Sequence, residues 1–292
     1  GDYIFVTSTS WNNGIQTTDI ISFRYVKGKI TAQAGNTIKG YLNNSFSLDE
    51  YQGYLRVVST YWDNQKNYDI NNLFIMDKEL KTVGSLVDIG DTCYFVTFRQ
   101  TDPLFSVDLS DPKNPKMLGE LKITGFSEYL HPYGDNLLLG IGWEVDSDTQ
   151  ENLGLKLSMF DISDPANVVE KDKMVIKNVY NSPAMDNYKA VMIDPEKNLF
   201  GFAYQTRLDD NYEHSASSYS LFSYDRKNGF TSTFTTSLNQ TKGNNDYYSD
   251  YYSDLENIRG LYIKNTFYLA TLEDIQSYNM NEDYAQTGKV TW

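Results

Sequence analysis

The sequence predicts an all-β protein, namely a β-propeller of four-stranded antiparallel blades. Two observations carry this prediction: a four-strand pattern recurs about six times along the 292 residues, and 15% of the residues are aromatic. Aromatic side chains suit a pleated, half-buried surface, and repeated units that pack on their neighbours can extend a fold to this length. A β-sandwich or a pair of barrels is the alternative, but those folds rarely repeat one pattern so regularly.

An apolar segment is expected to form the second strand of each blade. Such a strand is covered on both faces by adjacent blades, so it reads as a continuous apolar run. Six segments have this character: Tyr3–Ser8, Tyr54–Ser59, Cys93–Phe98, Leu137–Gly142, Leu199–Tyr204 and Thr266–Thr271.

The third and fourth strands follow each apolar segment. Fourth strands are more polar, as at Lys116–Ile123 and Val168–Ile176, because the outermost strand meets water. The turns before them place Asp111 and Asp164 in front of proline, which presets the backbone of a turn. The expected third strands are Asp19–Tyr25, Leu73–Asp77, Leu104–Leu109, Leu155–Ile162, Tyr219–Asp225 and Ile275–Asn279.

Short segments before the apolar runs are expected to be the first strands, facing a central channel. They are Phe46–Gly53, Phe126–Gly134, Ser182–Val191 and Glu256–Ile263. Convergent polar groups in a concave place are the default hypothesis for a ligand site. The channel-lining candidates are therefore Asp49, Glu50, Glu128, His131, Asp186, Asn187 and Arg259.

These strands divide one predicted domain, residues 1–292, into six units. The first unit lacks a strand before Tyr3, so the ring is expected to be incomplete at the N-terminus. The third unit is short before Cys93, so either the chain begins within a blade or residues are missing near 84–92. The expected units are 1–40, 41–88, 89–124, 125–180, 181–254 and 255–292.

Charge and composition exclude several classes of partner. The chain has 39 acidic and 25 basic residues, a net charge of −14, and repels phosphate backbones and anionic lipid. We therefore expect no nucleic-acid binding and, without a run of 18 apolar residues, no membrane insertion. The lone Cys93 cannot form an intrachain disulfide.

A family resemblance rests on residues 96–121, with further matches at 125–136, 154–165 and 193–199. Two of these segments share the sequence Asp-Leu/Ile-Ser-Asp-Pro. The chain resembles bacterial secreted proteins with a C-terminal β-propeller domain, distantly similar to WD-repeat propellers. The resemblance implies an extracellular or cell-surface protein and no established activity. Tyr188 stands where the resemblance leads us to expect histidine, which weakens a histidine site shared across blades.

Catalytic and metal signatures are sparse. Two histidines and one cysteine do not suit the usual zinc site, and no Gly-x-Ser-x-Gly motif is present. A hydrolase or lyase at the channel would use Glu128, His131 and Asp49 or Glu50. One acidic loop could supply oxygen ligands to Ca²⁺ through Glu144, Asp146, Asp148 and Glu151, although its spacing departs from the EF-hand pattern.

The predicted function is that of a non-catalytic extracellular module that binds a protein or a carbohydrate at the cell surface. Long polar loops at 143–153, 209–217 and 243–255 support it, since binding function concentrates in loops. The alternatives are the channel enzyme and a structural surface domain stabilised by Ca²⁺; no other cofactor is expected. The last loop could bind through Asp246, Tyr247, Tyr248, Asp250, Tyr251, Tyr252 and Asp254.

Overall fold

The chain forms two compact units, which are considered separately. Unit 1 comprises Gly1–Lys122 with Asp164–Val168, and unit 2 comprises Ile123–Ser163 with Val169–Trp292. A computed structural model describes residues 2–12, 14–42, 47–63, 67–84, 92–96, 103–108, 110–111, 116–149, 151–208, 215–238 and 255–292.

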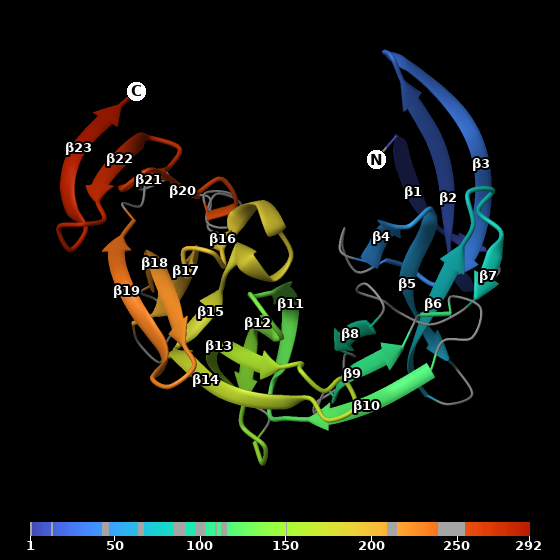
Figure 1. Ribbon diagram of the computed structural model, residues 1–292, viewed down its shortest axis with the longest axis horizontal. Helices are drawn as coiled ribbons and strands as arrows, with labels where there is room; N and C mark the ends of the chain where they lie inside the picture. Colours follow the sequence, from blue (N-terminus) through green and yellow to red (C-terminus); the bar gives the residue numbers. More distant parts are fainter. Residues whose placement is uncertain are drawn as a thin grey trace. The chain divides into compact units, whose positions relative to one another are not determined.

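Unit 1 contains three antiparallel sheets, drawn in blue to green in Figure 1. The first has the order β1-β2-β3, the second β4-β5-β6-β7 and the third β8-β9-β10. The strands are β1 (Tyr3–Asn12), β2 (Ile15–Val26), β3 (Lys29–Lys39), β4 (Leu48–Tyr51), β5 (Tyr54–Asp63), β6 (Tyr68–Met76), β7 (Thr82–Gly84), β8 (Thr92–Val96), β9 (Pro103–Asp108) and β10 (Lys116–Lys122).

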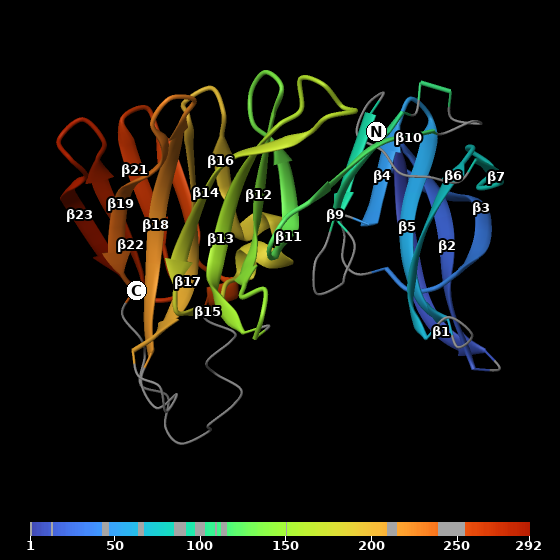
Figure 2. The same ribbon diagram turned by 90° about the horizontal axis from the view of Figure 1, so that it is seen from below.

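Unit 2 also contains three antiparallel sheets, which follow one another in Figures 1 and 2. Their orders are β11-β12-β13-β14, β15-β17-β18-β19 with β16 also on β17, and β20-β21-β22-β23. The strands are β11 (Phe126–Pro132), β12 (Leu137–Val145), β13 (Asn152–Asp161), β14 (Val169–Lys177), β15 (Val179–Asn181), β16 (Met192–Asp194), β17 (Leu199–Arg207), β18 (Ser215–Asp225), β19 (Gly229–Ser237), β20 (Arg259–Ile263), β21 (Thr266–Ala270), β22 (Asp274–Asn279) and β23 (Ala285–Thr291).

In the sheets β4–β7, β11–β14 and β20–β23 the strand order follows the predicted pattern, with the apolar run second. In β12 the six residues from Leu137 to Gly142 are all buried, and β13 beside it is buried from Gly154 to Phe160. The outer strand β14 alternates between exposed and partly buried residues. A first strand, two buried strands and a polar fourth strand are what a propeller blade requires.

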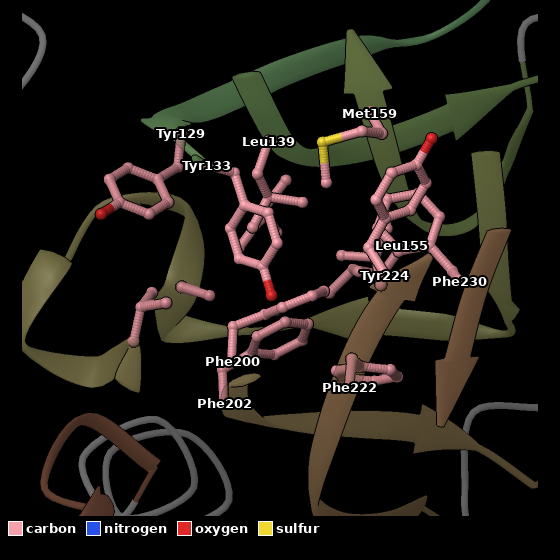
Figure 3. Packing of buried hydrophobic residues seen from close by; sticks show 14 of the residues in the cluster. Tyr129, Tyr133, Leu139, Leu155, Met159, Phe200, Phe202, Phe222, Tyr224 and Phe230 are labelled. Carbon is pink, nitrogen blue, oxygen red and sulfur yellow. The ribbon is translucent and has the colours of Figure 1, made fainter. Parts of the chain in front are cut away.

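Two aromatic-rich cores hold the sheets of unit 2 together. The first lies between the sheet β11–β14 and the sheet of β17 and β18, where Phe200, Phe202 and Phe222 have no exposed surface or almost none. Figure 3 shows these rings facing Leu139, Leu155 and Met159. Phe222 stacks on Phe200 and on Phe202, with ring centroids 5.4 Å apart in each pair.

The second core of unit 2 joins the sheet of β17 and β18 to the sheet β20–β23, through Tyr219, Leu221, Phe267, Leu269 and Tyr278. Unit 1 has an aliphatic core instead, made by Ile20, Ile38, Leu55, Val57, Met76 and Leu80 from its first two sheets.

The prediction of a first strand at Ser182–Val191 is wrong. Two 3-10 helices, η2 (Pro183–Met185) and η3 (Tyr188–Ala190), occupy most of this segment between β15 and β16. Pro183 suits the first position of η2 because proline has no N–H to leave unpaired there, and the Ser182 side chain caps that helix.

The sheet β1-β2-β3 has three strands in the structure, as the repeat predicts. The shortened region at residues 84–92 falls mostly outside the described residues. No helix among the described residues has the length and apolar character needed to cross a membrane.

Candidate functional site

The candidate site is a row of polar side chains along one edge of unit 2. This edge is formed by β11, by the segment that contains η2 and η3, and by β20. Helix η2 contacts β11 and helix η3 contacts β20, so the first segments of three successive sheets are neighbours. We call the five predicted residues on this edge the inner row: Glu128, His131, Asp186, Asn187 and Arg259.

Glu128 is placed by an irregularity in β11. The register of β11 against β12 shifts between Ser127 and Tyr129, so Glu128 is the extra residue of a β-bulge, a feature that redirects a side chain. Its Oε1 accepts a hydrogen bond of 2.8 Å from Nε1 of Trp143. Burial raises the pKa of Glu128, the Trp143 hydrogen bond lowers it, and the charge of Asp186 raises it. Glu128 therefore holds its proton to a higher pH than an ordinary glutamate.

His131 is bound to a tyrosine rather than to a carboxylate. Its Nδ1 lies 2.8 Å from the hydroxyl of Tyr129, two residues earlier on the same face of β11. Burial lowers the pKa of His131 and raises that of Tyr129 to about 12. The histidine is therefore neutral near pH 7 while the tyrosine keeps its proton. When the hydroxyl donates to Nδ1, the imidazole proton is on Nε2.

Asp186 and Asn187 occupy the junction of the two 3-10 helices. Asp186 is the C-cap of η2 and its side chain is exposed. Asn187 is the N-cap of η3, where its Oδ1 accepts from the N–H of Lys189 at 3.1 Å. The Nδ2 of Asn187 donates to Oε2 of Glu256 at 2.7 Å, which ties this segment to the turn before β20.

Arg259 has a supporting position at the start of β20. Its Nη1 donates to the carbonyl oxygens of Glu256 at 2.7 Å and Ile258 at 2.8 Å. Next to it, a Cβ at Gly260 would lie 2.0 Å from the hydroxyl oxygen of Tyr219, so only glycine fits. Tyr219 is fully buried, which raises its pKa, while the nearby charge of Arg259 lowers it.

The inner row therefore combines fixed and exposed polar groups. Glu128 and Asp186 are close enough for their charges to interact, and Asn187 and Arg259 both bind Glu256. No hydrogen bond between His131 and a carboxylate occurs within the part of the chain that the structure describes.

Sequence reasoning missed three partners of the inner row: Trp143, Tyr129 and Glu256. Trp143 could have been found from the register of the hairpin that β11 and β12 form. In that register Trp143 pairs with Phe126, close to Glu128. Tyr129 precedes His131 by two residues, so strand alternation puts both on one face. Glu256 was expected to begin a first strand, but β20 begins only at Arg259, so the place of Glu256 before the strand was not predicted.

The remaining predicted channel residues belong to unit 1. Asp49 forms an ion pair with Arg56, with 3.3 Å between Oδ2 and Nη1. Glu50 is the next residue of β4 and is exposed. The predicted catalytic grouping of Glu128 and His131 with Asp49 or Glu50 takes its members from both units and stays a prediction.

The acidic loop of unit 2 uses its carboxylates within the protein. Glu144 accepts from Nζ of Lys173 at 2.7 Å. Asp146 accepts from the N–H groups of Asp148 and Thr149 at 2.9 and 2.8 Å, and these bonds lower its pKa. No group of three or more candidate metal ligands is found among the described residues, Glu151 included. Ca²⁺ binding stays a prediction.

A buried lysine, missed by sequence reasoning, forms a charged network beside this loop. Lys156 on β13 has a fully buried side chain, and its Nζ donates to the carbonyl oxygen of Thr124 at 2.5 Å. The same Nζ lies 3.6 Å from Glu170 and 3.9 Å from Glu144. Burial lowers the pKa of Lys156, the two glutamates raise it, and Lys173 lowers it.

The tyrosine-rich loop lies outside the described residues. This holds for all its predicted contacts, Asp246, Tyr247, Tyr248, Asp250, Tyr251, Tyr252 and Asp254.

Comparisons with known proteins support the fold. A family model described as a beta propeller domain matches residues 2–282. An uncharacterised protein of Methanocaldococcus jannaschii is 40% identical over 216 residues, which are 68% of this chain and 32% of that protein. Another from Archaeoglobus fulgidus is 40% identical over 184 residues, 59% of this chain and 28% of that protein. The chain thus spans about a third of the length of these relatives.

A solved structure from Bacteroides uniformis, provisionally assigned as a 6-phosphogluconolactonase, is similar at a TM-score of 0.48 and 11% identity. That similarity covers 100% of this chain and 82% of the other, and it carries no argument about function.

Proposed function

Because the chain belongs to the β-propeller domain family, we propose that it is a non-catalytic binding module for an extracellular protein or glycan. The observation that carries the proposal is the inner row of unit 2. A few polar groups in fixed positions are what orient a ligand and make its binding specific.

Hydrogen bonds within the protein support this role by fixing the inner row before a ligand arrives. Trp143 holds one oxygen of Glu128, and Glu256 holds the amide of Asn187. The carboxylate of Asp186 is exposed, its charge acts on Glu128, and Asp186 directly precedes Asn187 in the chain. Groups that need no reordering on binding cost less conformational entropy, which favours affinity.

The chemistry of the inner row favours a ligand with hydroxyl or amine groups. Its carboxylates accept hydrogen bonds, and neutral His131 can donate from Nε2. The net charge of −14 disfavours sulfated or phosphorylated glycans, because like charges repel. A neutral or amino-sugar glycan, or a protein segment rich in hydroxyl and amine groups, fits best.

A glycan array and a pull-down with the purified chain test the proposal. Binding should weaken in the Glu128→Gln, Asp186→Asn double variant. It should be unchanged in Glu282→Gln, whose carboxylate is exposed in the turn after β22, away from the inner row. Absence of any ligand above background, or equal binding by both variants, would count against the proposal.

The raised pKa of Glu128 favours a second candidate, a hydrolase or lyase. A carboxyl group that keeps its proton to a higher pH than usual can act as a general acid, and the carboxylate of Asp186 lies near enough to contribute to this shift. Incubating each bound glycan with the wild-type chain separates the two functions. An enzyme cleaves the glycan and loses this activity in Glu128→Gln, whereas a binding module returns it intact.

The proposed location is the cell surface, and it rests on the resemblance to bacterial secreted propeller proteins. The matched relatives are archaeal. Protease treatment of intact cells that express the full-length protein tests the location: a surface protein is digested, and a protein inside the cell is protected.

A further inference from the structure

The hairpin formed by β2 and β3 carries a basic hollow, which is a second candidate binding surface. We propose that this hollow and the adjoining edge of β3 bind an extended, acidic segment of a partner protein. The proposal is independent of the inner row, because every residue that carries it lies in unit 1.

The hairpin reverses the charge of the chain locally. The chain has 39 acidic and 25 basic residues, yet no residue between Asp19 and Asp49 is acidic. Within that stretch Arg24, Lys27 and Lys29 lie at the end of β2, in the turn and at the start of β3. A local positive potential attracts the negatively charged groups that the rest of the chain repels.

These three cations line one hollow of about 470 Å³. The register of the two strands places Arg24 opposite Thr31. Two residues further along β2, Val26 lies opposite Lys29, so this pair is on the same face of the hairpin. In the described part of the chain, no residue of β1 lines the hollow. The lining residues are Arg24, Val26, Lys27, Lys29, Thr31 and Gln33.

The cations of the hollow are available to a ligand. Arg24, Lys27 and Lys29 are exposed, and none of them forms an ion pair with another described residue. The exposed Lys122 of the same unit, in contrast, is paired with Glu120 at 3.2 Å. A carboxylate among three unpaired cations would be attracted by all of them. Two copies of the chain repel each other through the net charge of −14, so the acidic segment is expected from a different protein.

The edge of β3 beside the hollow favours a polypeptide over other anions. In the described part of the chain β3 pairs with β2 alone, and Figure 1 shows it as the last strand of its sheet. An edge strand presents unpaired N–H and C=O groups, which an extended segment can pair with. Charged side chains discourage such pairing, as Glu170–Lys173 do on the outer strand β14. Between Lys29 and Lys39, β3 has no charged residue.

The start of β3 is the part that is open to a partner. A β-bulge at Gln33 shifts the register. The Nε2 of Gln33 donates to the carbonyl oxygens of Thr31 at 3.3 Å and Ala32 at 3.2 Å, and each oxygen keeps a second lone pair. Further along, Nδ2 of Asn36 donates at 2.7 Å to a carbonyl oxygen of the turn between β6 and β7. A bound segment should therefore pair with Lys29–Ala32 and place every second side chain over the hollow.

Labelled seven-residue peptides with capped ends are the probe, measured by fluorescence anisotropy at low salt, because salt screens exposed charges. A peptide of alternating threonine and glutamate should bind. Replacing its glutamates by lysine, or methylating its backbone nitrogens, should abolish binding. Lys29→Gln should weaken binding about 1.5- to fivefold, the strength of one exposed ion pair. Lys122→Gln, which removes an exposed lysine of unit 1 outside the hollow, should leave binding unchanged.

Hydrogen–deuterium exchange locates the bound peptide. The amides of Lys29–Ala32 should become protected, while those of the outer strand β14 should not. Equal binding of the lysine peptide or the methylated peptide would overturn the proposal, as would unchanged binding by Lys29→Gln. Equally tight binding of a polyuronate would assign the hollow to anionic glycans instead. Dimers that protect β3 without peptide, or a full-length polypeptide that binds no peptide, would also overturn it.

Discussion

Replacing Lys156 by methionine should destabilise unit 2 strongly. The ammonium group neutralises Glu144 and Glu170 and donates to Thr124, and all of this occurs at a fully buried side chain. Removing one partner of a buried ion pair costs about 3–5 kcal/mol, because the other charge stays buried and uncompensated. Lys173 still neutralises Glu144 in the variant, so the expected cost is near the lower limit, about 3 kcal/mol.

Urea unfolding followed by far-ultraviolet circular dichroism measures this cost. The charge-matched control is Lys156→Met with Glu170→Gln, which removes the uncompensated carboxylate as well. The control should recover much of the lost stability, since whole buried pairs are often replaceable without loss. If the single variant is as stable as the wild type, Lys156 does not hold a buried network. If the control is no better than the single variant, the loss comes from packing.

The pH dependence of Lys156 has a defined sign. Burial lowers its pKa below the ordinary value of 10.5, so between the two values the unfolded chain binds more protons than the folded chain. The contribution of Lys156 to stability therefore rises with pH in that window. The wild type should gain stability relative to Lys156→Met as the pH rises towards 10.5. A difference in stability between the two proteins that does not change with pH would contradict the lowered pKa of Lys156.

Further predictions concern the inner row, its supports and the acidic loop. Tyr219→Phe should stabilise unit 2 by about 1 kcal/mol, measured by urea unfolding, because the buried hydroxyl has no hydrogen-bond partner among the described residues. Gly260→Ala should destabilise unit 2, because its Cβ would meet that hydroxyl, and combining it with Tyr219→Phe should reduce this destabilisation. Asn187→Ala should lower the free energy of unfolding by about 1–2 kcal/mol, because its hydrogen bond to the carboxylate of Glu256 is lost. An unchanged free energy of unfolding would show that this bond does not stabilise the fold. The raised pKa of Glu128 adds stability at low pH that is lost as the pH rises through the pKa of the folded state. The stability of Glu128→Gln relative to the wild type should therefore increase as the pH rises from 4.5 through that raised value, and urea unfolding at a series of pH values checks it. If the acidic loop binds Ca²⁺, the metal should raise the Tm of the wild type and not of Asp148→Asn, and a Tm that chelator and Ca²⁺ leave unchanged removes that role.

Local pattern was enough to predict the buried strands, because burial imposes a pattern on neighbouring residues, but it failed at the first strand expected at Ser182–Val191. The continuous apolar run at Leu137–Gly142 could only suit a strand covered on both faces, and it became β12. The Asp-Pro turn at Asp164 likewise lies between β13 and β14, where Asp164 accepts a hydrogen bond from the N–H of Ala166 at 3.0 Å.

The geometry of the candidate site depends on features that local pattern does not carry. A bulge at Glu128 shifts β11 by one residue, and no neighbouring glycine or proline marks it. Lys156 lies within an apolar run and would be expected to point to water. It is buried because glutamates 12 residues before it and 14 residues after it are brought to it by strand pairing.

The proposed binding function requires that the inner row of unit 2 contacts the ligand. Hydrogen–deuterium exchange with and without a glycan found on the array tests it most directly. Protection is expected in β11, in the segment of η2 and η3, and at the start of β20 together, because these three segments carry the inner row. Protection confined to the outer strands β14, β19 and β23 would contradict it.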